Sequence, residues 1–229
     1  MKKIKKTTEP STLTHYRSSI SHANMNDSNI YEDFPQKTKQ GCKDEEVDNL
    51  RKQLLQEQGY ICCYCMSRID CDNSKIEHFK PQTHHRNLQI DYQNLFIACS
   101  GGEGQRAKEQ YCDTKKGESE LKKVDLLSSF DGEIAYKKES RGIKIYSEDS
   151  DLNSDIEQIL NLNVNVLYKN RKEIYDNAIN RLKKNGFKPD YIKRTINYFK
   201  DKHNGKYEPF CEMIVYFLTK KLKSKGVAI

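Results

Sequence analysis

The chain has 229 residues, of which 32% are charged and 35% hydrophobic, which is enough for one large or two small domains with a core. The mean hydropathy is −0.92, and no apolar run approaches the roughly eighteen residues of a membrane span. The charged start MKKIKKTTEP lacks the apolar stretch of a signal peptide, so we expect a cytoplasmic protein. The net charge of +7 suits a polyanionic partner, although AT-rich coding DNA also produces Lys-rich composition.

The first part of the chain is predicted to be an extended segment followed by a helix. Residues 1–43 contain Pro10, Pro35 and few apolar residues, which favours a segment that wraps the domain or docks a partner. A helix is predicted over 44–58, with Gly59 placed to end it. The apolar positions that define its helical spacing are Val47, Leu50, Leu54 and Leu55.

Residues 44–123 are predicted to form one module bracketed by cysteines. Within it, the pattern indicates a short strand over 76–79 that ends before Pro81 and a second strand over 95–99. The Gly-rich, polar segment 100–111 is predicted to be a flexible loop.

Residues 124–229 are predicted to form a connection, a hairpin and a helical region. The hairpin pairs 133–136 with 142–146, and the helices are separated by Gly186 and Pro189. Three apolar stripes at helical spacing indicate core-facing helices. They contain Ile156, Ile159, Leu160, Leu167, Ile174, Ala178 and Leu182, then Ile192, Ile196 and Phe199, and then Met213, Ile214, Phe217, Leu218 and Leu222.

Four of the eight cysteines form two pairs, Cys62 with Cys65 and Cys99 with Cys112. A Cys-x-x-Cys turn supplies two thiolates to one tetrahedral ion, and a second pair closes the shell, which is typical of structural zinc. The second pair is stretched, so buried or unpaired thiols are the alternative interpretation. Two further cysteines are substitute ligands, Cys63 and Cys71. The uneven spacing and the missing export signal favour metal ligands and spare thiols over a disulfide framework.

A set of polar residues inside this bracket indicates phosphodiester chemistry. Hydrolysis needs a base for water and a cation for the leaving oxygen. Because imidazole can accept a proton near neutral pH, His78 is the candidate base. Glu77 and Asp113 offer carboxylate ligands, which favour Mg²⁺ or Mn²⁺. A lone Glu-His pair is commonly a surface feature, and its position between the cysteine pairs is what gives it meaning.

The order of these motifs resembles the HNH nuclease superfamily with its ββα-metal fold. The motifs are a Cys-x-x-Cys, Glu-His, Asn-Leu, and a Cys followed by DTKKG. The resemblance is closest to the HNH subunit (PtuB-like) of Septu-type antiphage systems, including retron-associated members. It rests on EPSTLTHYR (9–17), LLQEQGYICCYC (54–65), KIEHFKPQ (75–82), YQNLFIAC (92–99), CDTKKG (112–117) and ILNLNVNVLYKNR (159–171).

The resemblance implies a role for each matching residue. His78 takes the place of the general base and Glu77 that of the first metal ligand. Asn94 matches the central Asn, which holds the loop and orients the base through backbone hydrogen bonds. Asp113 stands where the third motif residue is commonly His or Asn, which leaves the metal's identity open. Lys116 fits the trailing basic position that contacts a phosphate. The expected fold is α+β, mainly helical, with an embedded ββα-metal module and a four-cysteine zinc site.

The resemblance also implies partners. An SMC/ABC-like ATPase (PtuA-like) is the usual one, and retron versions add a reverse transcriptase with its RNA–DNA product. The chain has no P-loop motif of its own, so nucleotide sensing falls to such a partner. His85, in the loop after Pro81, is a candidate substrate contact, with a solvated loop as the alternative. The Lys-rich stretches 2–6 and 220–225 are interpreted as solvated, with phosphate contacts as the alternative.

Three functions remain open at this stage. The first is a defence nuclease that cuts DNA, and the second is the same chemistry directed at RNA, such as tRNA. The third is a non-catalytic, zinc-stabilised subunit that binds nucleic acid or bridges partners, for which His78 and Asp113 would be dispensable.

Overall fold

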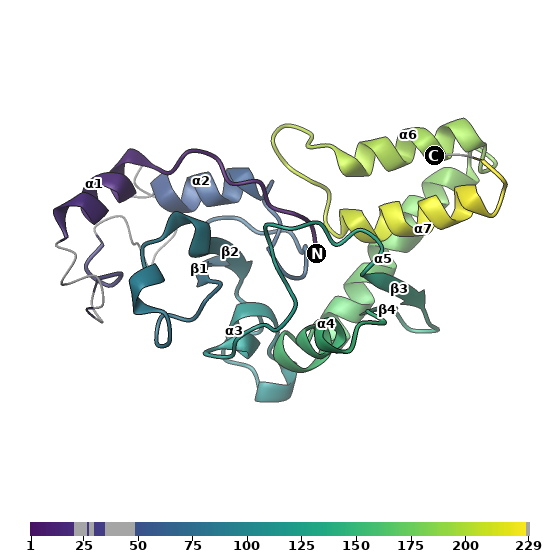
Figure 1. Cartoon of the computed structure of the whole chain (residues 1–229). Coiled ribbons are helices and arrows are strands. Elements are labelled where there is room, and N and C mark those ends of the chain that lie inside the picture. Colours follow the sequence, from purple (N-terminus) through teal and green to yellow (C-terminus); the bar gives the residue numbers. More distant parts are fainter. Residues whose placement is uncertain (21–26, 28–29, 35–48, 228–229) are drawn as a thin grey trace.

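The computed structural model describes residues 1–20, 27, 30–34 and 49–227, and it confirms an α+β fold. Its regular elements are α1 (Ser11–Ser19), α2 (Asn49–Glu57), β1 (Ser74–His78), β2 (Leu95–Cys99), α3 (Cys112–Lys116), β3 (Ala135–Lys138), β4 (Ile143–Tyr146), α4 (Ser150–Ser154), α5 (Asn165–Lys183), α6 (Pro189–Lys200) and α7 (Cys211–Lys223). The described strands form two small antiparallel sheets, β1–β2 and β3–β4. Figure 1 shows the first sheet among α1, α2 and α3, and the second beside α5 and α7.

The predicted strands and hairpin are present. In the first sheet His78 lies opposite Leu95 and Glu77 opposite Phe96. All five residues of β2 are buried, because α2 and α3 both contact this strand. In the second sheet Ala135 lies opposite Tyr146, so the predicted hairpin forms, but its first strand covers 135–138 instead of 133–136. The first sheet therefore ends at the two residues that the sequence marked for chemistry.

The N-terminal segment is partly helical, so the prediction of an extended segment is wrong for α1. Pro10 begins this helix, and its carbonyl accepts from the backbone N–H groups of Leu13 and Thr14. Leu13 is the one residue of α1 that is fully enclosed. A helix with a single buried residue has no apolar stripe, which explains why periodicity did not reveal it. The first part of the helix predicted over 44–58 lies outside the described residues, and α2 supplies the rest.

The C-terminal helices are present, but their first stripe is not continuous. After α4 the chain widens into a π-turn at Asp155–Ile159, and Asn161 adopts a positive φ of 48° before α5 begins. Asp155 is fully buried, and its carboxylate accepts from the backbone N–H groups of 122–124 at 2.7–3.0 Å. The π-turn therefore places this carboxylate at the segment that connects the cysteine-bracketed module (44–123) to the C-terminal region (124–229).

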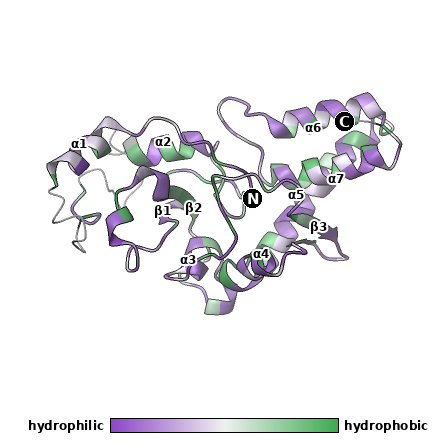
Figure 2. Ribbon diagram, viewed as in Figure 1, coloured by the Kyte–Doolittle hydropathy of each residue, from purple (hydrophilic) through white to green (hydrophobic). Residues whose placement is uncertain are grey.

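The buried apolar residues form one cluster that extends through both the cysteine-bracketed module and the C-terminal region. Figure 2 shows a hydrophobic β2, a partly hydrophobic α7 and a largely hydrophilic α6. Three apolar residues of α6 are buried, Ile192, Ile196 and Phe199. Within the described residues, no helix combines the length and the apolar character that crossing a bilayer would require.

The first eight residues, which we call the strap, contact both the cysteine-bracketed module and the C-terminal region. The backbone N–H of Ile4 donates to the Leu126 carbonyl at 2.8 Å. Lys2 forms an ion pair of 2.5 Å with Glu212 of α7, while Lys6 bonds to Glu57 of α2 at 3.3 Å. Lys6 is thus buried rather than solvated, unlike the interpretation of the Lys-rich stretch that contains it.

Candidate metal cluster and carboxylate–histidine site

Four cysteines form a compact buried cluster: Cys62, Cys65, Cys99 and Cys112. Their sulfur atoms all lie within 4.8 Å of one another. The Sγ atoms of Cys62 and Cys112 are 3.8 Å apart, as are those of Cys65 and Cys99. Sulfurs at the corners of a tetrahedron with Zn–S bonds of about 2.3 Å are separated by roughly 3.8 Å. The donor set and its spacing are therefore compatible with a structural zinc site.

The electrostatics of the cluster favour a bound cation. The pKa of the Cys62 thiol lies well below its usual value despite burial, because hydrogen bonding with the neighbouring cysteines favours its ionised form. Burial and the interaction with Cys62 raise the pKa of Cys112 well above its usual value. One thiolate thus suppresses ionisation of the next. Four thiolates in one buried place require a positive ion to balance their charge.

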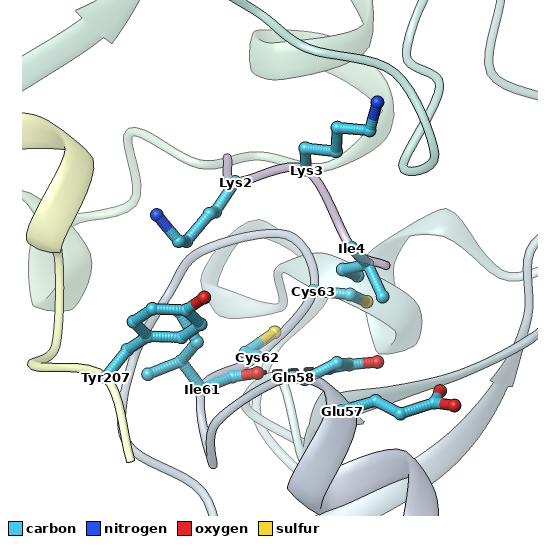
Figure 3. A pocket seen from close by; sticks show the side chains of 9 residues that line it. All are labelled: Lys2, Lys3, Ile4, Glu57, Gln58, Ile61, Cys62, Cys63 and Tyr207. Carbon is cyan, nitrogen blue, oxygen red and sulfur yellow. Dashed lines mark hydrogen bonds between the residues drawn. The ribbon is translucent and has the colours of Figure 1, made fainter. Parts of the chain in front are cut away.

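The local structure holds the cluster from several sides. Gln58, at the end of α2, donates to the carbonyls of Ile61 and Ile97 at 3.0 and 2.8 Å and accepts from the Ile97 N–H at 2.8 Å. This amide therefore fixes the turn that carries Cys62 against β2. Figure 3 shows Gln58, Cys62 and Cys63 together with the strap residue Ile4. No pattern in the sequence indicated this role of Gln58.

The two substitute ligands do not join the cluster. Cys63 is a buried free thiol, and burial raises its pKa well above the usual value. Cys71 is disulfide-bonded, although the spacing predicted a ligand or a spare thiol.

His78, the candidate base, lies at the end of β1 and is 7% exposed. Its Nε2 is 2.9 Å from the Gln89 carbonyl, and because a carbonyl can only accept, Nε2 carries the proton. Nδ1 is then the basic nitrogen, and it accepts from the Gln82 amide at 3.1 Å. The Tyr31 ring stands edge-on to the imidazole with ring centroids 4.4 Å apart. The hydrogen bonds thus fix the tautomer that a general base requires.

Glu77 lies beside His78 in the sequence but is enclosed by a different set of groups. Its Oε1 accepts from the Tyr64 hydroxyl at 2.7 Å and pairs with Lys116 Nζ at 2.9 Å. Burial raises the pKa of Glu77 well above its usual range, and the adjacent Asp113 carboxyl raises it further, while Lys116 opposes both. Two carboxyl groups that resist sharing negative charge are a pair that a divalent cation would stabilise.

Asn94 holds the loop between the two strands. Its Oδ1 accepts from the Lys80 N–H at 2.7 Å, and its Nδ2 donates to the carbonyls of Lys80 and Leu88 at 3.1 and 3.2 Å. Leu88 is followed by Gln89, whose carbonyl holds His78 Nε2. Asn94 therefore positions the backbone group that orients the histidine.

Lys116 and His85 were predicted to contact a phosphate or the substrate, and the structure gives each of them a partner within the chain. The Lys116 side chain is 1% exposed and also donates to the His78 carbonyl at 3.1 Å, so its charge is directed at Glu77 and not at the surface. His85 is more accessible, and its Nε2 lies 2.8 Å from Glu120.

The structure brings Glu77 and Asp113 together, with His78 next along β1. Among the described residues, the four cysteines are the only group of three or more His, Cys, Asp or Glu side chains close enough to share one ion. Comparison with protein-family models gives no match for this chain, and comparison with curated proteins gives none either. The function must therefore be inferred from the chemistry of these residues.

Proposed function

We propose that this protein is a metal-dependent endonuclease of the HNH type that hydrolyses phosphodiester bonds. The observation that carries the proposal is the juxtaposition of a fixed histidine tautomer with a carboxylate pair. His78 ends β1, and Asp113 lies in the first turn of α3. Glu77, which precedes His78 on β1, lies against Asp113 and pairs with Lys116 of α3. The four-cysteine cluster would hold a structural zinc, since it leaves no open coordination position for catalysis.

In this proposal His78 Nδ1 takes the proton of the attacking water. The Gln89 carbonyl keeps the proton on Nε2 and so keeps the lone pair on Nδ1. Gln82 now donates to that lone pair, so water reaches Nδ1 once the Gln82 amide turns away. Gln82 therefore controls access to the base.

Glu77 and Asp113 would hold the catalytic Mg²⁺ or Mn²⁺, which would stabilise the developing charge on the leaving oxygen. Two protein carboxylates suit Mg²⁺ in particular, because this ion usually keeps several waters and takes phosphate oxygens as ligands. Lys116 now bonds to the same Glu77 oxygen that accepts from Tyr64. The lysine and a cation would compete for Glu77, so Lys116 would be the residue that moves when the site is loaded.

The wider role that we propose is that of an effector in an antiphage defence system, with an SMC/ABC-like ATPase as its controlling partner. In a retron-associated version, a reverse transcriptase and its RNA–DNA product would form part of the same complex. The support for this is the family resemblance of the motifs in the sequence. The closed arrangement of Gln82, Tyr31 and Lys116 is consistent with an effector that is held inactive until it is triggered.

The decisive experiment measures cleavage by the chain co-purified with its partner, with Mg²⁺, on plasmid DNA and total cellular RNA. His78→Ala is the test variant and His84→Ala the matched control, because His84 is an exposed histidine of the same connection. Cleavage that persists in the control and disappears in His78→Ala, with metal content unchanged, supports the proposal. Equal cleavage by both variants would contradict the assignment of the base.

A second candidate function is a non-catalytic scaffold, favoured by the Glu77–Lys116 ion pair. Both side chains are almost fully buried, and such a pair can serve the fold alone. The scaffold predicts that Asp113→Asn and His78→Ala leave partner and nucleic-acid binding intact and that no divalent cation induces cleavage. Metal-dependent cleavage that is lost in Asp113→Asn excludes it.

A further inference from the structure

A groove that none of the preceding chemistry uses follows one face of α7. Its volume is about 930 Å³. The floor is the face of α7 that carries Glu212, Val215, Tyr216, Thr219 and Lys223. The strap also lines the groove, through Met1, Lys2, Lys3 and Lys5, and so do residues 129–132, Ile134 and Tyr136. In Figure 1 the N-terminus lies next to the beginning of α7, where these segments meet.

Exposed lysines from three separate segments surround this groove. Lys3 and Lys5 come from the strap, Lys200 from the end of α6 and Lys223 from the end of α7. Across the described part of the chain, none of the four forms an ion pair, in contrast to Lys2, which bonds to Glu212. The two Lys-rich stretches that are 214 or more residues apart in the sequence thus meet at one surface.

The surrounding charge is strongly positive. Residues 165–227 contain sixteen Lys and Arg against six Asp and Glu, a net charge of +10, whereas the whole chain carries +7. The rest of the chain is therefore net negative by three. The groove itself has two acidic side chains, Asp131 and Glu212, and the second is already neutralised by Lys2. A positive groove within this positively charged region attracts a polyanion.

The groove also presents aromatic surface. Tyr207 and Tyr216 are half-buried, and Tyr216 packs against Tyr136 with ring centroids 5.4 Å apart. Nucleotide bases and sugars pack on such rings, while phosphates contact lysines as point charges. Every nucleotide carries both a phosphate for the lysines and a base for the rings, whereas an acidic side chain offers only the charge, so the combination favours nucleic acid.

We propose that this groove binds the sugar–phosphate backbone of a nucleic acid without reading its sequence. Lys3, Lys5, Lys200 and Lys223 would each contact a phosphate, and the tyrosines would support the strand between them. The inference goes beyond the proposed cleavage, because a scaffold that does not cut would use the same groove.

The test measures binding in the full-length chain. Fluorescence anisotropy would follow a labelled 20-nucleotide DNA strand, the matching RNA strand and the DNA duplex, each from 50 to 300 mM NaCl. The background is His78→Ala without divalent cations, so that cleavage plays no part. The test variant changes the four groove lysines to Ala, and a second version changes them to Gln. The matched control removes four exposed lysines elsewhere: Lys108, Lys137, Lys169 and Lys193.

The groove variant should bind at least one of the probes about tenfold or more weakly at 100 mM NaCl, because each lost phosphate contact lowers the salt slope by about 0.7–0.9. The slope of log K against log salt should fall by about three, and the control should keep the wild-type slope. The probe with the largest loss identifies DNA or RNA as the ligand. Equal losses in groove variant and control would overturn the proposal, and so would unchanged binding. Displacement of the strand by polyglutamate at equal charge concentration would also overturn it, in favour of an acidic protein partner.

Discussion

Replacing Asn94 by Ala tests how the loop orients the candidate base. The substitution removes three hydrogen bonds to backbone groups, at 2.7, 3.1 and 3.2 Å, from a side chain that is 5% exposed. At about 0.5–1.5 kcal/mol for each net hydrogen bond, the free energy of unfolding should fall by roughly 2–4 kcal/mol. Urea denaturation followed by circular dichroism measures this change.

The same variant should lose cleavage while it keeps its metal. Releasing the Leu88 carbonyl frees the adjacent Gln89 carbonyl, which holds His78 Nε2 at 2.9 Å. Asn87→Ala is the matched control, because Asn87 is exposed in the same turn and should change stability by less than about 0.5 kcal/mol. A loss below about 1 kcal/mol in Asn94→Ala, or full cleavage activity, would refute the reasoning.

Two further perturbations test the cluster and the strap. Cys112→Ser should remove the bound metal and lower the free energy of unfolding by at least about 4 kcal/mol, whereas Cys63→Ser should keep the metal. Elemental analysis measures the metal content and thermal melting the stability. A Cys112→Ser protein that still binds metal would contradict the cluster. Burial lowers the pKa of Lys6 to about 8, although Glu57 opposes the shift. The folded state therefore releases this proton at lower pH than the unfolded state, so stability should rise from pH 8 to 10 by roughly 2–3 kcal/mol relative to Lys6→Met. Parallel pH profiles of the two proteins would contradict this.

Short-range patterns predicted most of the module correctly. The strand over 95–99 follows from a continuous run of apolar residues next to turn residues, and outside the module the hairpin was predicted with its first strand two residues too early. The two cysteine pairs meet because β2 ends at Cys99 and α3 begins at Cys112, and a 2.9 Å bond from Tyr111 N–H to the Gly101 carbonyl closes the loop between them. Contacts between elements that are close in the sequence, such as these, can be predicted from sequence patterns.

Contacts between distant segments were not predictable in the same way. Lys116 was expected at a phosphate, because the family resemblance places it at the trailing basic position of the motif. Its burial depends on the tertiary packing that brings Glu77 and Tyr64 to α3. A buried charge needs a partner, but the identity of that partner is a property of the fold.

The motif at 159–171 also makes contacts with distant segments that the sequence did not predict. Asn161 donates to the carbonyls of Lys108 and Gln110 at 3.2 and 2.8 Å, and the Leu160 carbonyl accepts from the Cys112 N–H at 2.9 Å. Arg171 is buried and bonds to the Ile143 carbonyl at 2.7 Å. The loop that was predicted to be flexible is therefore anchored at its end by residues of the helical region. The sequence marked these residues as part of a motif without indicating that they secure the fourth cysteine.

The strap has a consequence for the way the molecule is made. Met1 and Ile4 are buried, and Lys2 finds Glu212 only after 210 intervening steps of the chain. During synthesis the strap is made well before its binding surface on α7, because the two are separated by most of this sequence. Contacts of such long sequence separation form late and slow folding. A nascent chain that has not yet reached α7, or a chain truncated before it, consequently lacks the ion pair between the strap and this helix.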